Sequence, residues 1–140
     1  MDIVLDASIA VKWFSAINED YVENALAIQE RHVSGEIKII VPDLFFLEVL
    51  NAFITKSQSG IEDISLVKDV IFKMNLEIKY PDEAMLSESL KIAFKHSLTI
   101  YDALYIALAK SCGAILYTED KKILSCQNIY HFITDIKNFT

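Results

Sequence analysis

The chain has 140 residues, of which 53% are hydrophobic, and it carries a formal net charge of −7. This length indicates one domain that can bury a core without disulfides or structural metals, and the composition argues against disorder. The acidic balance argues against the broad basic surface of many nucleic-acid-binding proteins, and no apolar stretch reaches the roughly 18 residues of a membrane helix.

Short aliphatic runs bounded by turn residues predict strands, and longer apolar or amphipathic runs predict helices. In chain order, the predicted elements are a strand at Asp2–Asp6, helices at Ala7–Phe14 and Glu19–Val33, a strand at Ile37–Val41, helices at Leu44–Lys56 and Ile61–Asn75, a strand at Leu76–Tyr80, helices at Asp82–Ser97 and Leu98–Ala109, a strand at Ala114–Thr118 and a short strand at Asn128–Phe132.

Strands that alternate with helices predict an α/β fold with a central parallel sheet of four to five strands. We find no internal repeat, low-complexity tract or linker in the sequence. The polar stretch at residues 57–60 is too short to separate domains and is typical of a helix–helix turn. Residues 1–140 are therefore expected to form a single domain.

The chain start and the cysteines favour the cytoplasm. The opening "MDIVLDASIAVKWF" lacks the basic leader and small-residue cleavage site of a signal peptide. Cys112 and Cys126 follow no metal-binding spacing, and reduced structural thiols are the expected state of such a pair. We therefore expect a cytoplasmic protein.

Four acidic residues stand out by their positions. Asp6 closes the first predicted strand and Asp120 follows the fourth, and ligands in parallel sheets bind beyond these carboxyl ends. Glu48 is the only charge in "LFFLEVLNAFIT", and Asp102 is the only charge between Tyr101 and Ala109. A helix that is apolar nearly all round is a buried helix, and an ionised carboxylate is costly to bury without a positive partner.

Each acid also has a purely structural interpretation. Asp6 or Ser8 could cap the first helix, and the spacing of Thr99 and Asp102 matches a capping box in which Asp replaces the usual Glu. Asp120, in "TEDKK", could lie in a solvated turn. For Glu48, which lies in mid-helix, capping offers no explanation, and an exposed stripe or a paired site remains.

Taken together, the four acids predict a metal site. A cluster of carboxylates with no basic partner requires a cation, and hard oxygen ligands suit Mg²⁺ or Mn²⁺. Such ions commonly serve phosphate chemistry, because they activate water and neutralise charge on a phosphodiester. Asn51 lies three residues after Glu48 and shares its helical face.

Over nearly its whole length the sequence resembles the PIN-domain nucleases, particularly the VapC-type toxins of prokaryotic toxin–antitoxin pairs. The resemblance is carried by "VLDASIAVKWF", "VPDLFFLEVLNAF" and "LTIYDALYIALAKSCGAILYTED", in this order. The residues at positions that match the family's motifs are Asp6, Ser8, Glu48, Asn51, Asp102, Thr118 and Asp120.

The resemblance implies a three-layer α/β/α sandwich and cleavage of RNA with Mg²⁺ or Mn²⁺. It also implies a homodimer and a cognate antitoxin that covers the site. The catalytic metal ligands, direct or through water, would be Asp6, Glu48, Asp102 and Asp120, and the supporting polar groups would be Ser8, Asn51 and Thr118. Glu119 stands beside Asp120, and we favour Asp120 from its place in the motif.

The chain has a single arginine, Arg31, so RNA contacts are expected from lysines such as Lys12, Lys121 and Lys122. Three alternatives remain open: an RNA-processing nuclease without an antitoxin, a non-catalytic binding module, and a phosphatase with a nucleophilic aspartate. The common phosphatases carry a second acid where this chain has Ser8.

One helix also suggests an interface. "LFFLEVLNAF" has more large apolar residues than one buried stripe needs, so part of it, for example Phe45 or Phe46, is expected at a dimer or antitoxin interface.

Overall fold

The computed structural model describes residues 1–56 and 58–140. Strands and helices alternate along most of the chain, as the sequence predicts. The elements are β1 (Asp2–Leu5), α1 (Ala7–Val11), α2 (Val22–Val33), β2 (Lys38–Pro42), α3 (Leu44–Lys56), α4 (Ile61–Lys73), β3 (Glu77–Lys79), α5 (Glu83–His96), α6 (Ile100–Cys112), β4 (Ile115–Thr118), α7 (Lys121–Leu124), β5 (Ile133–Asp135) and the 3₁₀-helix η1 (Ile136–Asn138).

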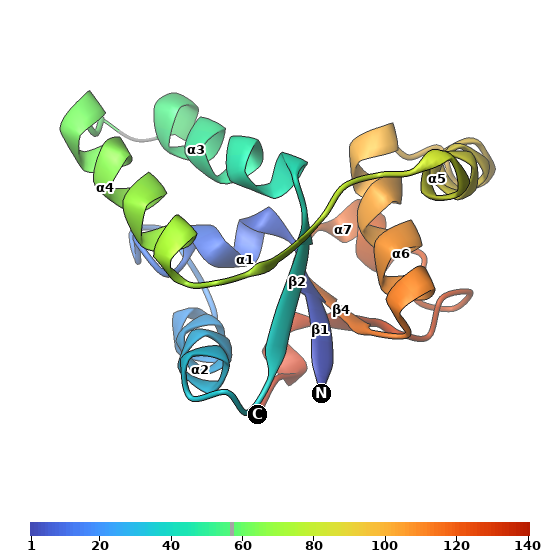
Figure 1. Cartoon of the computed structure of the whole chain (residues 1–140), viewed down its shortest axis with the longest axis horizontal. Coiled ribbons are helices and arrows are strands. Elements are labelled where there is room, and N and C mark those ends of the chain that lie inside the picture. The colour runs from blue at the N-terminus through green and yellow to red at the C-terminus, as the bar shows by residue number, and fades with distance from the viewer. Residues whose placement is uncertain (57) are drawn as a thin grey trace.

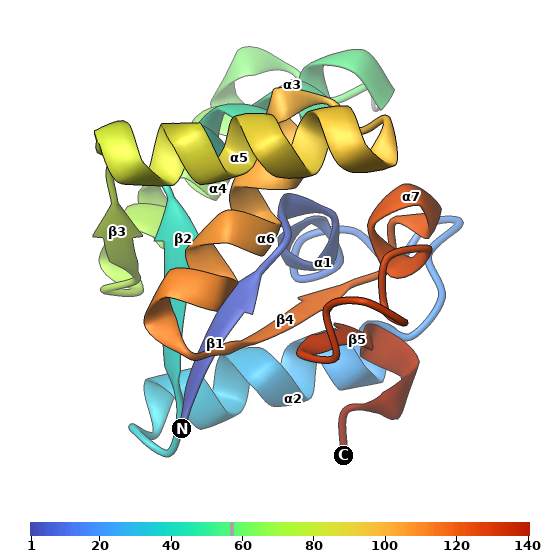
Figure 2. The same ribbon diagram turned by 90° about the vertical axis from the view of Figure 1, so that its right-hand side faces the viewer.

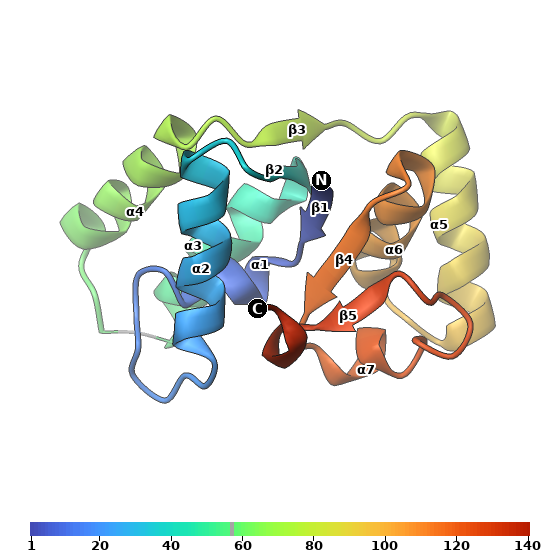
Figure 3. The same ribbon diagram turned by 90° about the horizontal axis from the view of Figure 1, so that it is seen from below.

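The strands form one parallel sheet in the order β3-β2-β1-β4-β5. Val4 of the central strand pairs with Ile40 of β2 on one side and with Leu116 of β4 on the other. Figure 3 shows β3 and β5 at opposite edges. The chain runs from β1 outward to β3 and then returns to the other side of β1, which creates the switch point where ligands bind in open parallel sheets.

Helices cover both faces of the sheet, so the predicted α/β/α sandwich is confirmed. Figure 1 shows α1 to α4 on one side of the strands and α5 and α6 on the other, and Figure 2 shows α5 running across the upper end of the sheet. Side chains of a strand alternate between these layers. Ile3 and Leu5 pack with the first group of helices, whereas Val4 packs with the second.

Several element boundaries differ from the sequence-based prediction. α1 ends at Val11 rather than at Phe14, and α2 begins at Val22 because Tyr21 has a left-handed backbone with φ of 56°. The strand expected at 128–132 lies instead at Ile133–Asp135. The earlier residues form turns, since the amides of Ile129 and Tyr130 both donate to one carbonyl, that of Cys126. The sequence also did not predict α7 and η1.

The expectation that Phe45 lies at an interface is wrong, because its side chain is fully buried in the core. Phe46 is half-buried, and its ring stacks on that of Phe72 with centroids 4.6 Å apart. The apolar side chains that α3 does expose are Leu47, at 72%, and Ile54, at 64%. Phe45 therefore takes no part in an interface, whereas a role for Phe46, or for the exposed Leu47 and Ile54, stays a prediction.

Cys112 and Cys126 are free thiols, as expected. Across residues 1–56 and 58–140, no helix combines the length and the apolar character that a membrane span requires. In the predicted turn at residues 57–60, residue 57 lies outside the described part, and Gly60 precedes the first residue of α4.

Candidate metal and active site

The four acids approach one another at the carboxyl edge of the sheet. Asp6 directly follows β1, and Asp120 follows the neighbouring strand β4. Glu48 lies in the second turn of α3, which starts beyond β2, and Asp102 lies in the first turn of α6. Figure 1 shows the first turns of α3 and α6 at the same, upper end of the sheet as the start of α1. Parallel pairing therefore brings together acids that are far apart in the sequence.

Asp6 is buried, with 7% of its surface exposed. It precedes α1, but its side chain makes no capping hydrogen bond. Instead its Oδ2 accepts from the hydroxyls of Ser8 and Thr118, each at 2.8 Å. Burial raises the pKa of Asp6 to about 6; the two hydroxyls oppose this shift, and the charges of Asp120 and Asp102 add to it. The structure thus rules out the capping role for Asp6.

Glu48 is half-buried, and its Oε1 accepts a 2.7 Å hydrogen bond from the Tyr105 hydroxyl of α6. Burial raises the pKa of Glu48 to about 7, although the Tyr105 hydroxyl opposes the shift. The charges of Asp6, Asp102 and Asp120 raise it further. Glu48 therefore belongs to the same electrostatic cluster as the other three acids, which favours the paired site over the exposed stripe.

Asp102 is half-buried at the start of the most buried helix of the fold. Its amide donates to the Thr99 hydroxyl at 3.1 Å, so the N-cap half of the expected capping box is present. Burial raises the pKa of Asp102, as does the charge of Asp120, while the Thr99 hydroxyl and the Lys122 ammonium lower it. Capping by Thr99 and membership of the acidic cluster thus coexist.

Asp120 precedes α7, and its Oδ1 accepts from the amides of Lys122 and Ile123 at 2.9 and 3.1 Å. Its own amide donates to the Thr118 hydroxyl at 3.0 Å, and this hydroxyl donates to Asp6. Thr118 therefore links two of the acids. The neighbouring Glu119 turns away into an ion pair, which agrees with the choice of Asp120 as the acid that faces the cluster.

The expectation that Lys12 contacts RNA is wrong. The Lys12 side chain has no exposed surface, and its Nζ forms ion pairs with Glu19 at 2.8 Å and Glu119 at 2.9 Å. Lys121 and Lys122 are exposed at the start of α7, and neither forms an ion pair within the described residues. They are the remaining candidates from the expected set.

One further residue contacts the acids and was not predicted from the sequence to do so. The Tyr105 hydroxyl donates to Glu48. Tyr105 lies three residues after Asp102 on the same helical face, and a buried tyrosine hydroxyl needs a hydrogen-bond partner, so this signal was available. Asn51, in contrast, is exposed, and its side chain makes no hydrogen bond to the acids in the described part.

The donor set fits a hydrated divalent cation. One oxygen each of Asp6, Glu48 and Asp120 accepts the hydrogen bonds above, which leaves Asp6 Oδ1, Glu48 Oε2 and Asp120 Oδ2 without a protein donor. No buried side-chain oxygen of the described residues lacks a partner, so these three oxygens reach solvent.

No three His, Cys, Asp or Glu side chains among residues 1–56 and 58–140 are grouped closely enough to ligate one ion directly. Ligation partly through water fits this spacing, because Mg²⁺ usually retains several waters and takes only one or two carboxylates.

Comparison with known proteins identifies the family. The model of the PIN domain matches residues 3–126. Ribonuclease VapC3 of Pyrobaculum aerophilum is 29% identical over 127 residues, which cover 88% of this chain and 92% of that protein. Exonuclease VapC9 of the same organism is 30% identical over 96 residues, which cover 69% of this chain and 72% of that protein.

Solved structures share the fold at low sequence identity. Mycobacterium tuberculosis VapC20, described as a toxin that cleaves the sarcin–ricin loop, superposes with a TM-score of 0.70 at 11% identity, over 89% of this chain and 94% of that one. A toxin–antitoxin complex from Klebsiella pneumoniae gives 0.63 at 15% identity, over 88% and 90%. With the match of the family model and the two VapC relatives, it follows that this chain belongs to the PIN-domain family, in its VapC-type branch.

Proposed function

We propose that this protein is a metal-dependent endoribonuclease that hydrolyses RNA phosphodiester bonds with Mg²⁺ or Mn²⁺. The observation that carries the proposal is the cluster of Asp6, Glu48, Asp102 and Asp120, none of which forms an ion pair within the described residues. Burial, with the charges of neighbouring carboxylates, raises the pKa values of Asp6, Glu48 and Asp102, and a bound cation would favour the ionised forms of these three acids.

Each part of the site has a role in this reaction. The four carboxylates would hold the ion, directly or through water, with Ser8 and Thr118 orienting Asp6 and Tyr105 orienting Glu48. A bound divalent ion supplies activation of water and neutralisation of charge on the phosphodiester. Hydrolysis of this kind is expected to leave a 3′-hydroxyl and a 5′-phosphate. Asn51 would contact the substrate rather than the acids.

We further propose that the protein is the toxin of a type II toxin–antitoxin pair, acts in the cytoplasm and forms a homodimer, and that residues 1–140 form one domain. The support for the toxin role is the VapC relationship and the likeness to a toxin–antitoxin complex. A small overlapping gene for a DNA-binding protein would favour this role, whereas its absence would favour RNA processing. The one-domain proposal is supported by Phe139, close to the C-terminus, which packs into the core formed by β1 and α1.

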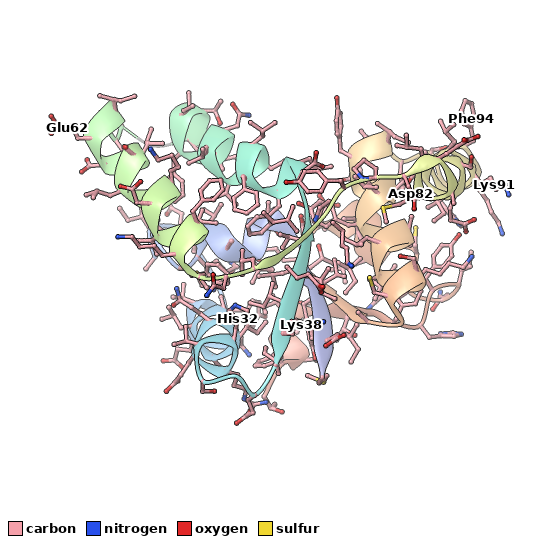
Figure 4. All side chains as sticks on the ribbon, in the orientation of Figure 1. His32, Lys38, Glu62, Asp82, Lys91 and Phe94 are labelled. Carbon is pink, nitrogen blue, oxygen red and sulfur yellow. The ribbon has the colours of Figure 1, made fainter. Side chains whose placement is uncertain are left out.

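The direct test compares RNA cleavage by Glu48→Gln and wild type in Mn²⁺ and in excess EDTA. The variant should keep its fold, and its rate of RNA cleavage should fall by at least about 100-fold. Changes to groups that only orient a metal ligand reduce activity by up to about this factor, and Glu48 is proposed to bind the ion itself. Glu62→Gln is the matched control, since Figure 4 shows Glu62 at the far end of α4. Equal cleavage of a broad RNA panel in EDTA, by protein free of contaminating nuclease, would disprove the metal mechanism.

A further inference from the structure

Lys12 is one of the few buried charged side chains of the described fold, and its ammonium group has an acceptor for each of its three protons. Its Nζ contacts Glu19 Oε2 at 2.8 Å, Glu119 Oε2 at 2.9 Å and the Asp20 carbonyl oxygen at 2.5 Å. These three acceptors match the three protons of an ammonium. Burial lowers the pKa of Lys12, but the two glutamates more than offset this effect, so the net shift is upward and Lys12 stays charged.

The three acceptors come from two separate segments of the chain. Glu19 and Asp20 lie in the loop between α1 and α2, whereas Glu119 lies between β4 and α7. Lys12 itself caps the C-terminal end of α1. The lysine therefore joins a surface loop to the turn that carries Asp120, across a sequence separation of more than 100 residues.

Glu119 directly precedes Asp120, so a fixed Glu119 restrains the backbone of its neighbour. On the other side, the Asp120 amide is held by the Thr118 hydroxyl at 3.0 Å, and its carboxylate accepts from the amides of Lys122 and Ile123. Among the described residues, the direct hydrogen bonds of Asp120 are all local to this short turn. Without Lys12, Glu119, with 31% of its side chain exposed, could turn into solvent.

We propose that Lys12 is a positioning residue that acts through Glu119 to hold Asp120 in its place in the carboxylate cluster. This inference rests on the proposed function, because it assigns Lys12 a role in the metal site. Lys12 touches none of the four acids in the described hydrogen bonds and ion pairs, and it is therefore not a catalytic residue.

The positioning role and a simple charge effect predict opposite results for Lys12→Met. The methionine keeps the length of the buried stem but removes the positive charge. If Lys12 acted only through its charge, removing it would strengthen cation binding at the nearby site. If Lys12 positions Asp120, the same change weakens cation binding, by about tenfold or more, as is usual for changes to groups that orient metal ligands.

The experiment uses the full chain and three variants: Lys12→Met, Glu119→Ala and Glu19→Ala. Titration calorimetry measures the Kd for Mn²⁺, and NMR follows the amide signals of Asp120 and Ile123. Each of the two glutamate variants removes one carboxylate partner of the same ammonium, and they are compared at the Ile123 amide, because a substitution at residue 119 shifts the amide signal of its neighbour Asp120 directly. Lys12→Met and Glu119→Ala should both shift the Ile123 amide, while Glu19→Ala should leave it close to its wild-type position.

The outcomes separate the two proposals. Unchanged or tighter Mn²⁺ binding in Lys12→Met, with unmoved Asp120 and Ile123 amides, overturns the role of Lys12. Equal shifts of the Ile123 amide in both glutamate variants also overturn it, since the effect would then be general to the ion pair. Wild-type protein that binds no Mn²⁺ overturns the proposed metal site instead, and the amide shifts still decide whether Lys12 positions Asp120. If Lys12→Met does not fold, Glu119→Ala carries the test.

Discussion

The carboxylate of Asp6 has one oxygen bound within the fold and one oxygen available to a ligand. It accepts two hydroxyl hydrogen bonds through one oxygen and leaves the other oxygen open to solvent. Burial and neighbouring charges make its ionised form unfavourable, so without a cation this site opposes stability at neutral pH. A strained site of this kind is a common cost of function.

This property predicts a pH dependence of stability in metal-free protein. Because the pKa of Asp6 is raised from 3.8 to about 6, its contribution to the free energy of unfolding is greatest below pH 4 and is lost as the pH rises through 6. The loss amounts to about 3 kcal/mol, at about 1.4 kcal/mol per pKa unit. Asp6→Asn should remove this loss, so the variant should gain stability over wild type between pH 4.5 and 7.5.

Urea unfolding in metal-depleted buffer across this pH range measures the difference. Asp69→Asn is the control, because Asp69 is exposed on α4 and its change removes the same charge without burial. A difference between Asp6→Asn and wild type that stays constant with pH would contradict the assignment of the shift to Asp6.

At the scale of elements, the site depends on where helices begin relative to strand ends. α3 and α6 each bring one acid to the carboxyl edge of the sheet, and α7 begins with Asp120 as its cap. Lys121 and Lys122 are exposed at the start of α7, where their ammonium groups would contact the negatively charged phosphates of an RNA substrate. The backbone amide of Lys122 donates to Asp120, and its ammonium lowers the pKa of Asp102, so α7 carries positive charge towards the cluster.

We therefore predict that α7 contacts the RNA backbone. Lys121→Ala with Lys122→Ala should weaken RNA binding and reduce the slope of log affinity against log salt concentration by about 1.4, at about 0.7 per phosphate contact with a single strand. Binding of a fluorescent RNA in EDTA at several salt concentrations tests this.

The control for α7 is Lys91→Ala with Lys95→Ala, which removes two exposed lysines from α5. Figure 4 shows Lys91 on the outer side of this helix, together with Phe94. If both double variants lose affinity equally, RNA binding is a matter of net charge and α7 has no specific part in it.

The exposed apolar side chains of α3 support a prediction about self-association. Leu47 and Ile54 are seven residues apart and lie on one face of the helix. Replacing both by Ser should leave the fold intact and reduce dimer formation, as measured by light scattering at micromolar concentration. Val33→Ser, which changes an equally exposed residue at the end of α2, is the control. Wild-type protein that is strictly monomeric would refute the prediction.

At the scale of the whole molecule, metal binding should be coupled to stability. An ion that binds only the native state stabilises it by about 1.4 kcal/mol at ten times its Kd. For a domain of this size, this corresponds to roughly 3–6 °C in Tm. Asp102→Asn should raise the Tm of the metal-free protein, because it removes repulsion, and should abolish most of the metal-induced shift.

Thermal melts of wild type and Asp102→Asn, each in EDTA and in millimolar Mn²⁺ at fixed ionic strength, provide the measurement. The amide of residue 102 still donates to Thr99 in the variant, so the N-cap is preserved. Clear destabilisation of the metal-free variant would show that the carboxylate serves mainly to stabilise the helix start.

The sequence by itself determined the α/β architecture and pointed to the four acids. Buried strands and helices carry their own periodicity, and a lone acid in an apolar helix such as α6 is visible without coordinates. Local signals also located Thr99 as an N-cap, because capping involves residues only three positions apart.

Only the tertiary structure decided the long-range partners. Lys12 and Glu119 form an ion pair with each other, so Lys12 is not on the RNA-binding surface and Glu119 does not face the cluster. Tyr105 donates a hydrogen bond to Glu48, and Phe45 is buried in the core. The last strand lies at Ile133–Asp135 rather than at the predicted 128–132, because pairing with β4 determines which residues form it. The physical reason is the same throughout: local periodicity encodes burial, whereas the partner of a buried charge or hydroxyl depends on how distant segments pack.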